Sequence, residues 1–239
     1  MGKKTVVFGS FVVDLMGRTP HLPAAGETVK GTVFKMGPGG KGFNQGVAAH
    51  KAGADVTMVT KLGRDTFADI ALNTMKELGM KQDRILYSDD TETGCALIMV
   101  DENTSQNEIV VILGSCNTIS DAEVDSLEDL LDGCEYMLTQ LETNVSSVER
   151  IVDIACKKGV KVILNTAPVQ PISNELLSKV DLITPNEVEA EILTGVKVDS
   201  EEAADKAAEW FFGKGVKRVL ITLGGRGVYI NTGDKKGII

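Results

Sequence analysis

Residues 135–168, EYMLTQLETNVSSVERIVDIACKKGVKVILNTAP, set the fold class of this chain. The runs at 135–142 and 160–168 are rich in apolar residues, which is typical of buried strands. The segment between them, 144–159, has the composition and spacing of an amphipathic helix. A strand, a helix and a strand in this order predict an α/β protein with a mostly parallel sheet.

The same alternation continues on both sides of this unit. Strand patterns and helix patterns follow one another, so we expect one open sheet with helices on both faces. The last segment predicts a strand, a glycine turn and a second strand. Strands are predicted at 5–11, 55–63 and 180–186, helices at 43–54, 65–79, 187–195 and 200–215, and the strand–turn–strand at 216–231.

Two segments interrupt the alternation, at about residues 14–35 and 93–113. The second has the pattern of a hairpin around a polar turn. We expect both to be β segments inserted into one α/β domain that spans residues 1–239, and together they could form a small sheet. The apolar face of a small sheet needs cover, which a substrate cleft or a second subunit would provide.

The composition is that of an ordinary globular protein, with 239 residues, 43% of them hydrophobic and 25% charged. The net charge of −9 and the lack of a basic stripe argue against nucleic-acid binding. Four cysteines without a C-x-x-C pair indicate free thiols in a reducing compartment. The chain shows neither a signal-peptide cleavage pattern nor an apolar run of membrane length, so we expect a cytoplasmic protein without a membrane contact.

The glycine-rich stretch MGPGGKGFNQG, residues 36–46, raises the question of a phosphate cradle. Gly37, Gly39 and Gly42 match the G-x-G-x-x-G spacing of a dinucleotide turn. That turn must follow the first strand directly, whereas this stretch comes about thirty residues after it. The Walker A pattern fails too, because a glycine follows Lys41 where Ser or Thr is required.

Two interpretations of this stretch remain open. Glycines allow the backbone to approach a ligand closely, and Lys41 and Asn44 lie one helical turn apart, where both could bind a polyhydroxyl compound. Alternatively, the stretch is a turn that only starts a helix.

Two further motifs also have a functional and a structural interpretation. Asn186 and Glu189, at a helix start, could hold water around Mg²⁺, although taken alone the motif favours an N-cap with an acidic first turn. The turn in ITLGGRGV, residues 221–228, fits a nucleotide along a strand edge, but it also fits an ordinary hairpin.

Taken together and in order, the motifs resemble the ribokinase family of carbohydrate kinases over the whole chain. The resemblance rests on GSFVVD (9–14), PAAGETVKG (23–31), GGKGFNQGVAA (39–49), TGCALIMV (93–100), LTQLE (138–142), ITPNEVEAEILTG (183–195) and VLITLGGRGV (219–228). It implies a ribokinase-like three-layer α/β/α sandwich with a small β lid, and transfer of the γ-phosphoryl group of MgATP to the 5-hydroxyl of a pentose, D-ribose above all.

The resemblance also assigns roles to residues. It implies that Gly39, Gly40, Lys41 and Asn44 contact sugar hydroxyls and that Asp14 and Glu142 accept hydrogen bonds from them. It implies that Asn186 and Glu189 organise Mg²⁺ and the ATP phosphates. It implies that Thr222, Gly224 and Gly227 flank the nucleotide, and that two lids pair in a homodimer.

The chain departs from the family in two respects. The family's catalytic base is an Asp in a Gly-Ala-Gly-Asp motif, which we expect beyond Ile239 together with a site for a monovalent cation such as K⁺. We therefore expect these residues to be part of a longer protein and to be inactive alone. Val12 replaces a sugar-binding Asn, so either the substrate lacks the matching hydroxyl, as 2-deoxyribose does, or a neighbour or water replaces the Asn and ribose remains the substrate.

Other functions stay open at this point. The chain could be a kinase for another sugar, or a homologue that binds sugar or nucleotide without catalysis. A dinucleotide-dependent oxidoreductase is disfavoured by the position of the glycines.

Overall fold

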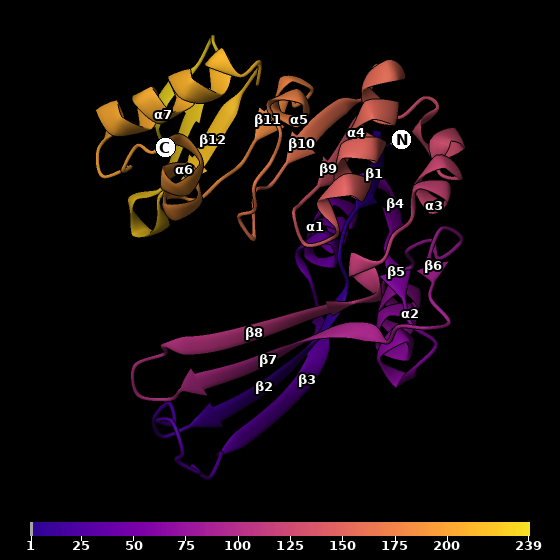
Figure 1. The fold of residues 1–239 in the computed structure, drawn as a ribbon, viewed down its shortest axis with the longest axis vertical. Helices are drawn as coiled ribbons and strands as arrows, with labels where there is room; N and C mark the ends of the chain where they lie inside the picture. The colour runs from indigo at the N-terminus through magenta and orange to yellow at the C-terminus, as the bar shows by residue number, and fades with distance from the viewer. Residues whose placement is uncertain (1) are drawn as a thin grey trace.

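The computed structural model describes residues 2–239, and two sheets make up its frame (Figure 1). The larger sheet has eight strands, the smaller sheet has four, and β5 (Lys61–Leu62) pairs separately with β6 (Leu86–Tyr87). The strands of the large sheet are, in spatial order, β14 (Lys236–Ile238), β13 (Val228–Asn231), β12 (Val219–Thr222), β11 (Leu182–Ile183), β10 (Lys161–Leu164), β9 (Tyr136–Thr139), β1 (Lys4–Phe8) and β4 (Asp55–Val59).

The large sheet is parallel from β4 to β12, as the alternating pattern predicts. In the unit that set the fold class, β9 and β10 pair in parallel with Met137 opposite Val162. The predicted strand–turn–strand at 216–231 is an antiparallel hairpin of β12 and β13, and β14 continues it at the edge.

Helices cover both faces of the large sheet, and the alternation of side chains along β1 shows how. Val7 belongs to a core with α1 and α2, whereas Val6 and Phe8 belong to a second core with the remaining helices. Successive strand residues point to opposite faces, so one strand contributes to both cores. The helices are α1 (Lys41–Lys51), α2 (Thr66–Leu78), α3 (Asp121–Asp125), α4 (Val145–Lys157), α5 (Asn174–Ser178), α6 (Glu187–Thr194) and α7 (Glu201–Gly213).

The two segments that interrupt the alternation pair with each other in the four-stranded sheet, which we call the lid sheet. It has the order β3 (Val33–Gly39), β2 (Val12–Thr19), β7 (Thr93–Asp101) and β8 (Asn107–Gly114). The sheet projects as a separate layer below the large sheet (Figure 1). Its strands extend beyond the expected segments, since β2 begins at Val12 and β3 runs on to Gly39.

No helix within residues 2–239 is long and apolar enough to cross a membrane.

Candidate functional site

Three of the predicted site residues lie where parallel strands of the large sheet end. Glu142 follows β9, Asn186 follows β11, and Thr222 is the last residue of β12. Carboxyl ends of parallel strands share one edge of a sheet, which is the usual place for ligands in open α/β folds. We call Asp14, Gly39, Gly40, Lys41, Asn44 and Glu142 the Asp14 cluster, and Asn186, Glu189, Thr222, Gly224 and Gly227 the Asn186 cluster.

Glu142 is buried and holds the start of α1 against β1. Its Oε2 accepts hydrogen bonds from Ser10 Oγ at 2.5 Å and from the backbone N–H of Lys41 at 2.8 Å. A carboxylate at the N-terminus of a helix is favourable because the first N–H groups lack intrahelical partners. Within residues 2–239 no hydrogen bond reaches Oε1, so this oxygen is available to a ligand.

Ser10 makes hydrogen bonds to Glu142 and α1 that the sequence did not reveal. Its Oγ accepts from the backbone N–H of Gly42 at 3.3 Å, and its carbonyl accepts from that of Phe43 at 2.8 Å. Ser10, two positions after the end of β1, therefore fixes the first turn of α1, which carries Lys41 and Asn44. The motif GSFVVD contained the signal, but nothing in it showed that a helix from about thirty residues later returns to the serine.

Gly39 leaves room for the carboxylate of Asp14. Both lie in the paired strands β2 and β3, where Asp14 is opposite Gly37 and Val12 is opposite Gly39. A Cβ atom at Gly39 would lie 2.6 Å from Asp14 Oδ2, which no real side chain tolerates. Burial, and secondarily the charge of Glu142, raises the pKa of the Asp14 carboxyl above its usual value.

Gly40 and Gly42 are needed because α1 starts directly against the chain after β1. Gly40 is the N-cap of α1 with φ of 92°, and a Cβ there would lie 2.9 Å from Val12 N. A Cβ at Gly42 would lie 2.5 Å from Ser10 N. The end of the glycine stretch thus starts a helix, which agrees with both open interpretations. Gly37 and Gly39 are strand residues of β3, which agrees with the rejection of a dinucleotide turn.

The side chains of Lys41 and Asn44 make no hydrogen bond or ion pair with any residue in the described range 2–239. Both lie in the first turn of α1, three positions apart, with Lys41 half-buried and Asn44 exposed. Their ammonium and amide groups are therefore available to a ligand. Residues three apart are neighbours on a helix surface, so one ligand could contact both side chains.

Asn186 and Glu189 form a complete capping box at the start of α6. Asn186 Oδ1 accepts from the backbone N–H of Glu189 at 2.8 Å, and Glu189 Oε2 accepts from that of Asn186 at 3.0 Å. Thr166 Oγ1 also donates to Glu189 Oε2, at 3.0 Å. The structural interpretation of this motif, an N-cap with an acidic first turn, is confirmed.

The same geometry favours indirect contact with a metal. The oxygens of Glu189 already accept hydrogen bonds, and residues 2–239 contain no group of three His, Cys, Asp or Glu side chains suited to a metal. Mg²⁺ prefers oxygen ligands and keeps several waters. The donor set of Asn186 and Glu189 therefore fits Mg²⁺ held through water and phosphate oxygens, rather than a protein cage.

The glycine turn after β12 lies beside this capping box. Thr222 forms a bridge with Asn186, and its backbone N–H donates to Pro185 O at 3.0 Å. Gly224 has φ of 55° and Gly227 has φ of 94°, both in the region that glycine adopts most easily. The hairpin interpretation is confirmed, and it brings the turn to the start of α6.

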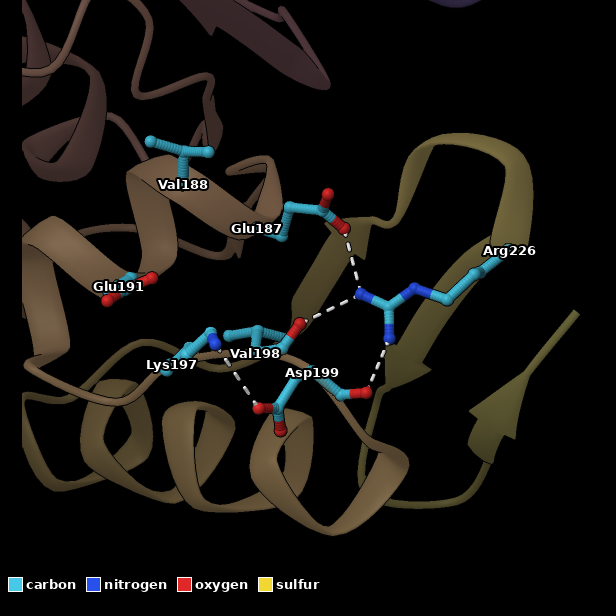
Figure 2. A pocket seen from close by; sticks show the side chains of 7 residues that line it. All are labelled: Glu187, Val188, Glu191, Lys197, Val198, Asp199 and Arg226. Atoms are coloured by element: carbon cyan, nitrogen blue, oxygen red, sulfur yellow. Dashed lines mark hydrogen bonds and ion pairs between the residues drawn. The ribbon is translucent and has the colours of Figure 1, made fainter.

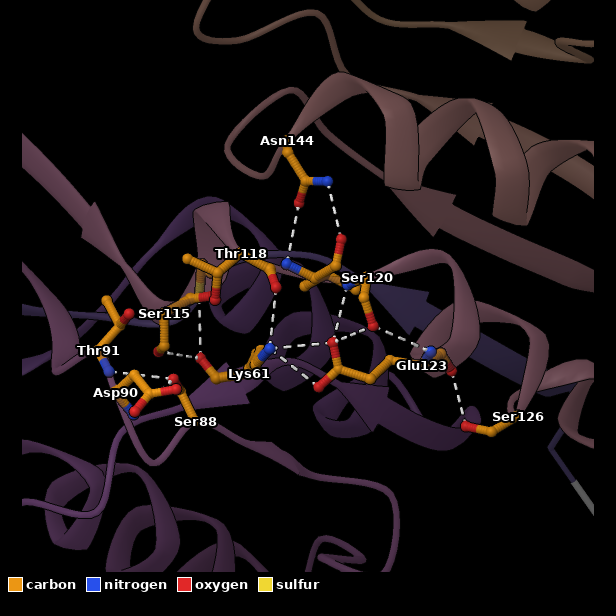
Figure 3. A network of polar contacts seen from close by, with 12 residues as sticks. Lys61, Ser88, Asp90, Thr91, Ser115, Thr118, Ser120, Glu123, Ser126 and Asn144 are labelled. Carbon is orange, nitrogen blue, oxygen red and sulfur yellow. Dashed lines mark hydrogen bonds and ion pairs between the residues drawn. The ribbon is translucent and has the colours of Figure 1, made fainter.

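The buried Lys61 connects the chain just after β8, the last strand of the lid sheet, to β5 and α3 (Figure 3). Lys61 Nζ donates to Thr118 O and to the Glu123 carboxylate, both at 2.9 Å, and Ser115 Oγ donates to Lys61 O at 2.7 Å. Ser115 directly follows β8. The network thus fixes the end of the lid sheet against β5, and nothing in the local sequence around Lys61 indicated it.

The comparison with known proteins identifies the family. The model of the pfkB family of carbohydrate kinases matches residues 3–239. The chain belongs to this family. A carbohydrate kinase must hold two substrates and exclude water between them.

Relatives and solved structures cover nearly all of this pfkB-family chain. It is 41% identical over 239 residues to the ribokinase of Haemophilus influenzae, covering 100% of this chain and 78% of the relative. It is 36% identical over 231 residues to the deoxyribokinase of Salmonella typhimurium, covering 96% of this chain and 75% of the relative. The structure of Arabidopsis thaliana ribokinase complexed with ribose and ATP matches with a TM-score of 0.87 and 28% identity, covering 100% of this chain and 78% of the other.

Proposed function

We propose that this protein is a ribokinase, which transfers the γ-phosphoryl group of ATP to the 5-hydroxyl of D-ribose and forms ribose 5-phosphate. The observation that carries the proposal is the Asp14 cluster. The Asp14 carboxylate beside Gly39, an available Oε1 on Glu142, and the unengaged Lys41 and Asn44 bring several acceptors and donors together from three segments of the chain. Several sugar hydroxyls need such a set.

In the proposed mechanism, the chain contributes mostly positioning. Asp14 and Glu142 accept from hydroxyls of the sugar, while Lys41 and Asn44 donate, so that the 5-hydroxyl is oriented for in-line attack. Closure of the lid sheet over the sugar excludes water, which would otherwise accept the phosphoryl group.

The Asn186 cluster is proposed to hold the nucleotide as its magnesium complex. Asn186 and Glu189 would orient waters of the ion, and the turn that contains Thr222, Gly224 and Gly227 would lie along the nucleotide. Bound Mg²⁺ neutralises charge on the transferred phosphoryl group. A monovalent cation such as K⁺ stays a prediction from the family resemblance.

The direct test is ATP-dependent phosphorylation of D-ribose and 2-deoxy-D-ribose by the protein made from its complete reading frame. Faster turnover of ribose is the expected result. Preference for 2-deoxyribose would favour the alternative that Val12 suggests. ATP binding without turnover of either sugar would favour another sugar, or a homologue that only binds.

Val12 offers a specific test of sugar choice. It is buried and apolar, so a hydroxyl facing it without a water partner would lose about 1–3 kcal/mol. We expect Val12→Asn to raise kcat/KM for ribose relative to 2-deoxyribose by about tenfold, which corresponds to about 1.4 kcal/mol. Val13→Ile, a substitution at the next position with a side chain on the opposite face, is the control. An unchanged ratio in Val12→Asn would mean that a neighbour or water already replaces the Asn.

We further propose that the protein forms a homodimer through the lid sheet. Phe34 is 69% exposed, Val110 is 60% exposed and Ile109 is 52% exposed, so both faces of this sheet carry uncovered apolar side chains. Adjacent strand residues point to opposite faces. Ile109→Glu and Val110→Glu therefore test one face each.

Sedimentation equilibrium is expected to show a dimer for the unmodified protein and a monomer for one of these two variants. Burying an unpaired carboxylate at the interface is far more costly than the roughly 1.5–3 kcal/mol lost with the apolar side chain. A monomeric unmodified protein, or two dimeric variants, would contradict this proposal.

A further inference from the structure

The side chain of Arg226 connects the glycine turn to two other segments (Figure 2). Its Nη1 donates to Asp199 O at 2.8 Å, and its Nη2 donates to Val198 O at 2.8 Å and to the Glu187 carboxylate at 2.9 Å. One guanidinium thus makes three hydrogen bonds, two of them to backbone carbonyls. A planar fork of donors suits this arrangement better than the ammonium of a lysine would.

The segments joined by Arg226 are the two halves of the Asn186 cluster. Arg226 ends the turn that contains Gly224, whereas Glu187 is the first residue of α6 and directly follows Asn186. Val198 and Asp199 lie between α6 and α7, so they fix the guanidinium from the other side. The Thr222–Asn186 bridge joins the base of the turn to the start of α6, and the Arg226 side chain adds the contact from the far end of the turn.

The Gly224–Gly227 turn needs the hydrogen bonds of Arg226 because its glycines have few packing contacts. A Cβ atom at Gly224 or at Gly225 would have no other atom within 4 Å, so both positions are open. Three glycines within 224–227 also give the unbound turn much conformational freedom, which is costly to restrict. Its internal hydrogen bonds, such as Leu223 N–H to Gly227 O at 2.9 Å, close the turn but do not orient it.

The neighbouring cavity argues that Arg226 does not itself bind a phosphate. The cavity has a volume of about 480 Å³, and its lining includes Glu187, Glu191 and Asp199 beside Lys197 and Arg226. Three carboxylates against two cations repel an anion. The guanidinium also directs both Nη atoms at protein acceptors, so its role is to place other groups.

We propose that Arg226 is a positioning residue for the nucleotide: it holds the Gly224–Gly227 turn at the distance from Asn186 that the phosphates require. This inference rests on the proposed function. It predicts that loss of the guanidinium weakens nucleotide binding and leaves sugar binding unchanged, because the Asp14 cluster contains none of its partners.

Isothermal titration calorimetry with MgADP and, separately, with D-ribose tests the proposal on the protein made from its complete reading frame. We expect Arg226→Ala to raise the Kd for MgADP about tenfold, the size of a loss of about 1.4 kcal/mol, and to leave the Kd for ribose within about twofold. Arg226→Lys is expected to recover part of the loss, because an ammonium can keep some of the hydrogen bonds.

Arg150→Ala is the matched control. The Arg150 side chain is 40% exposed against 43% for Arg226, and it forms a two-pronged ion pair with Asp125 at 2.6 and 2.7 Å. It lies on α4 and contacts neither cluster, so both Kd values should be unchanged. A general loss of stability from removing a surface arginine would affect both variants alike.

The outcomes separate the two proposals. If the unmodified protein does not bind MgADP, the proposed function is wrong. If it binds and Arg226→Ala binds equally well, or if the ribose Kd rises by the same factor, the positioning role is wrong. Should Arg226→Ala fail to fold, Glu187→Ala removes one acceptor of the same guanidinium, and an unchanged Kd for MgADP in that variant would also overturn the inference.

Discussion

Asp14→Asn is expected to weaken ribose binding by about 100-fold and, at the same time, to raise the free energy of unfolding at pH 7. Two charge-assisted hydrogen bonds from sugar hydroxyls contribute about 1.5–3 kcal/mol each, and an amide can replace only one of the two acceptor oxygens. A loss of about 3 kcal/mol corresponds to about 100-fold in Kd. Calorimetry with ribose measures the first effect, and urea unfolding without ligand measures the second.

The gain in stability follows from the raised pKa of the Asp14 carboxyl. Burial and the charge of Glu142 disfavour the ionised form in the native state. The native protein therefore binds a proton at pH values where the unfolded chain has already released it. Stability falls as pH rises through the window between the unfolded pKa and the raised native pKa, and at pH 7 the ionised carboxylate is destabilising. Asparagine removes this effect because it does not ionise.

The same pKa makes ribose binding sensitive to acid. A protonated carboxyl has lost one of its acceptor sites, so affinity should fall as pH decreases through the native pKa of Asp14, which is raised from the usual value of an aspartate. In Asp14→Asn this component of the pH profile should be missing. If ribose affinity fell at the same acidic pH in both proteins, the loss would belong to the titration of another group.

Two further comparisons distinguish the effect of moving the Asp14 carboxylate from the effect of removing its charge. Gly39→Ala should weaken ribose binding because its Cβ would displace the Asp14 carboxylate, whereas Gly37→Ala, two residues earlier in the same strand, meets nothing within 4 Å. Asp69→Asn, an exposed position on α2, controls for the loss of one negative charge. Equal ribose affinity in Gly39→Ala and Gly37→Ala would contradict the proposed role of Asp14.

Local patterns were sufficient to predict most of the large sheet and most helices, although the edge strand β14 was not predicted. The predicted strands and helices have apolar patterns of their own, and some helices also have a side-chain N-cap, such as Asp65 before α2 and Asn186 before α6. The predicted strands were too long, since β11 contains only Leu182 and Ile183. The helices α3 and α5 were not predicted because five residues are too few to show a period.

Contacts between distant segments could not be predicted in this way. The lid sheet depends on a parallel pairing of β2 with β7, in which Val12 is opposite Gly94, and no local pattern specifies such a pairing. The hydrogen bonds of Ser10 to α1 and of Arg226 to the loop before α7 also join segments that are distant in the sequence, so no local pattern predicts them. Motifs indicated which residues to expect in the site, but the packing reasons for the glycines among them became visible only in three dimensions.

Gly42→Ala is expected to destabilise the protein by about 2 kcal/mol or more and to weaken ribose binding. Gly42 is a helical residue, so alanine alone would favour the helix by about 1 kcal/mol. Its Cβ, however, would lie 2.5 Å from Ser10 N and 2.6 Å from Gly9 C, and backbone atoms cannot rotate away. The first turn of α1 must therefore move from β1, and Lys41 and Asn44 move with it; overpacking of this kind costs about 1–3 kcal/mol beyond the gain in propensity.

Gly46→Ala is the matched control, because Gly46 is buried one turn later in the same helix. A Cβ there would meet only side-chain atoms of Met58 and Met80, the nearest being Met58 Sδ at 3.1 Å. Methionine side chains are flexible and can adjust, so the change in unfolding free energy should stay within about 1 kcal/mol of zero. Urea unfolding curves and ribose titrations of the two variants give the comparison. Similar stabilities and similar ribose affinities would show that the close approach of α1 to β1 is not what requires glycine at position 42; a loss confined to Gly42→Ala would show that this backbone contact places Lys41 and Asn44 for the sugar.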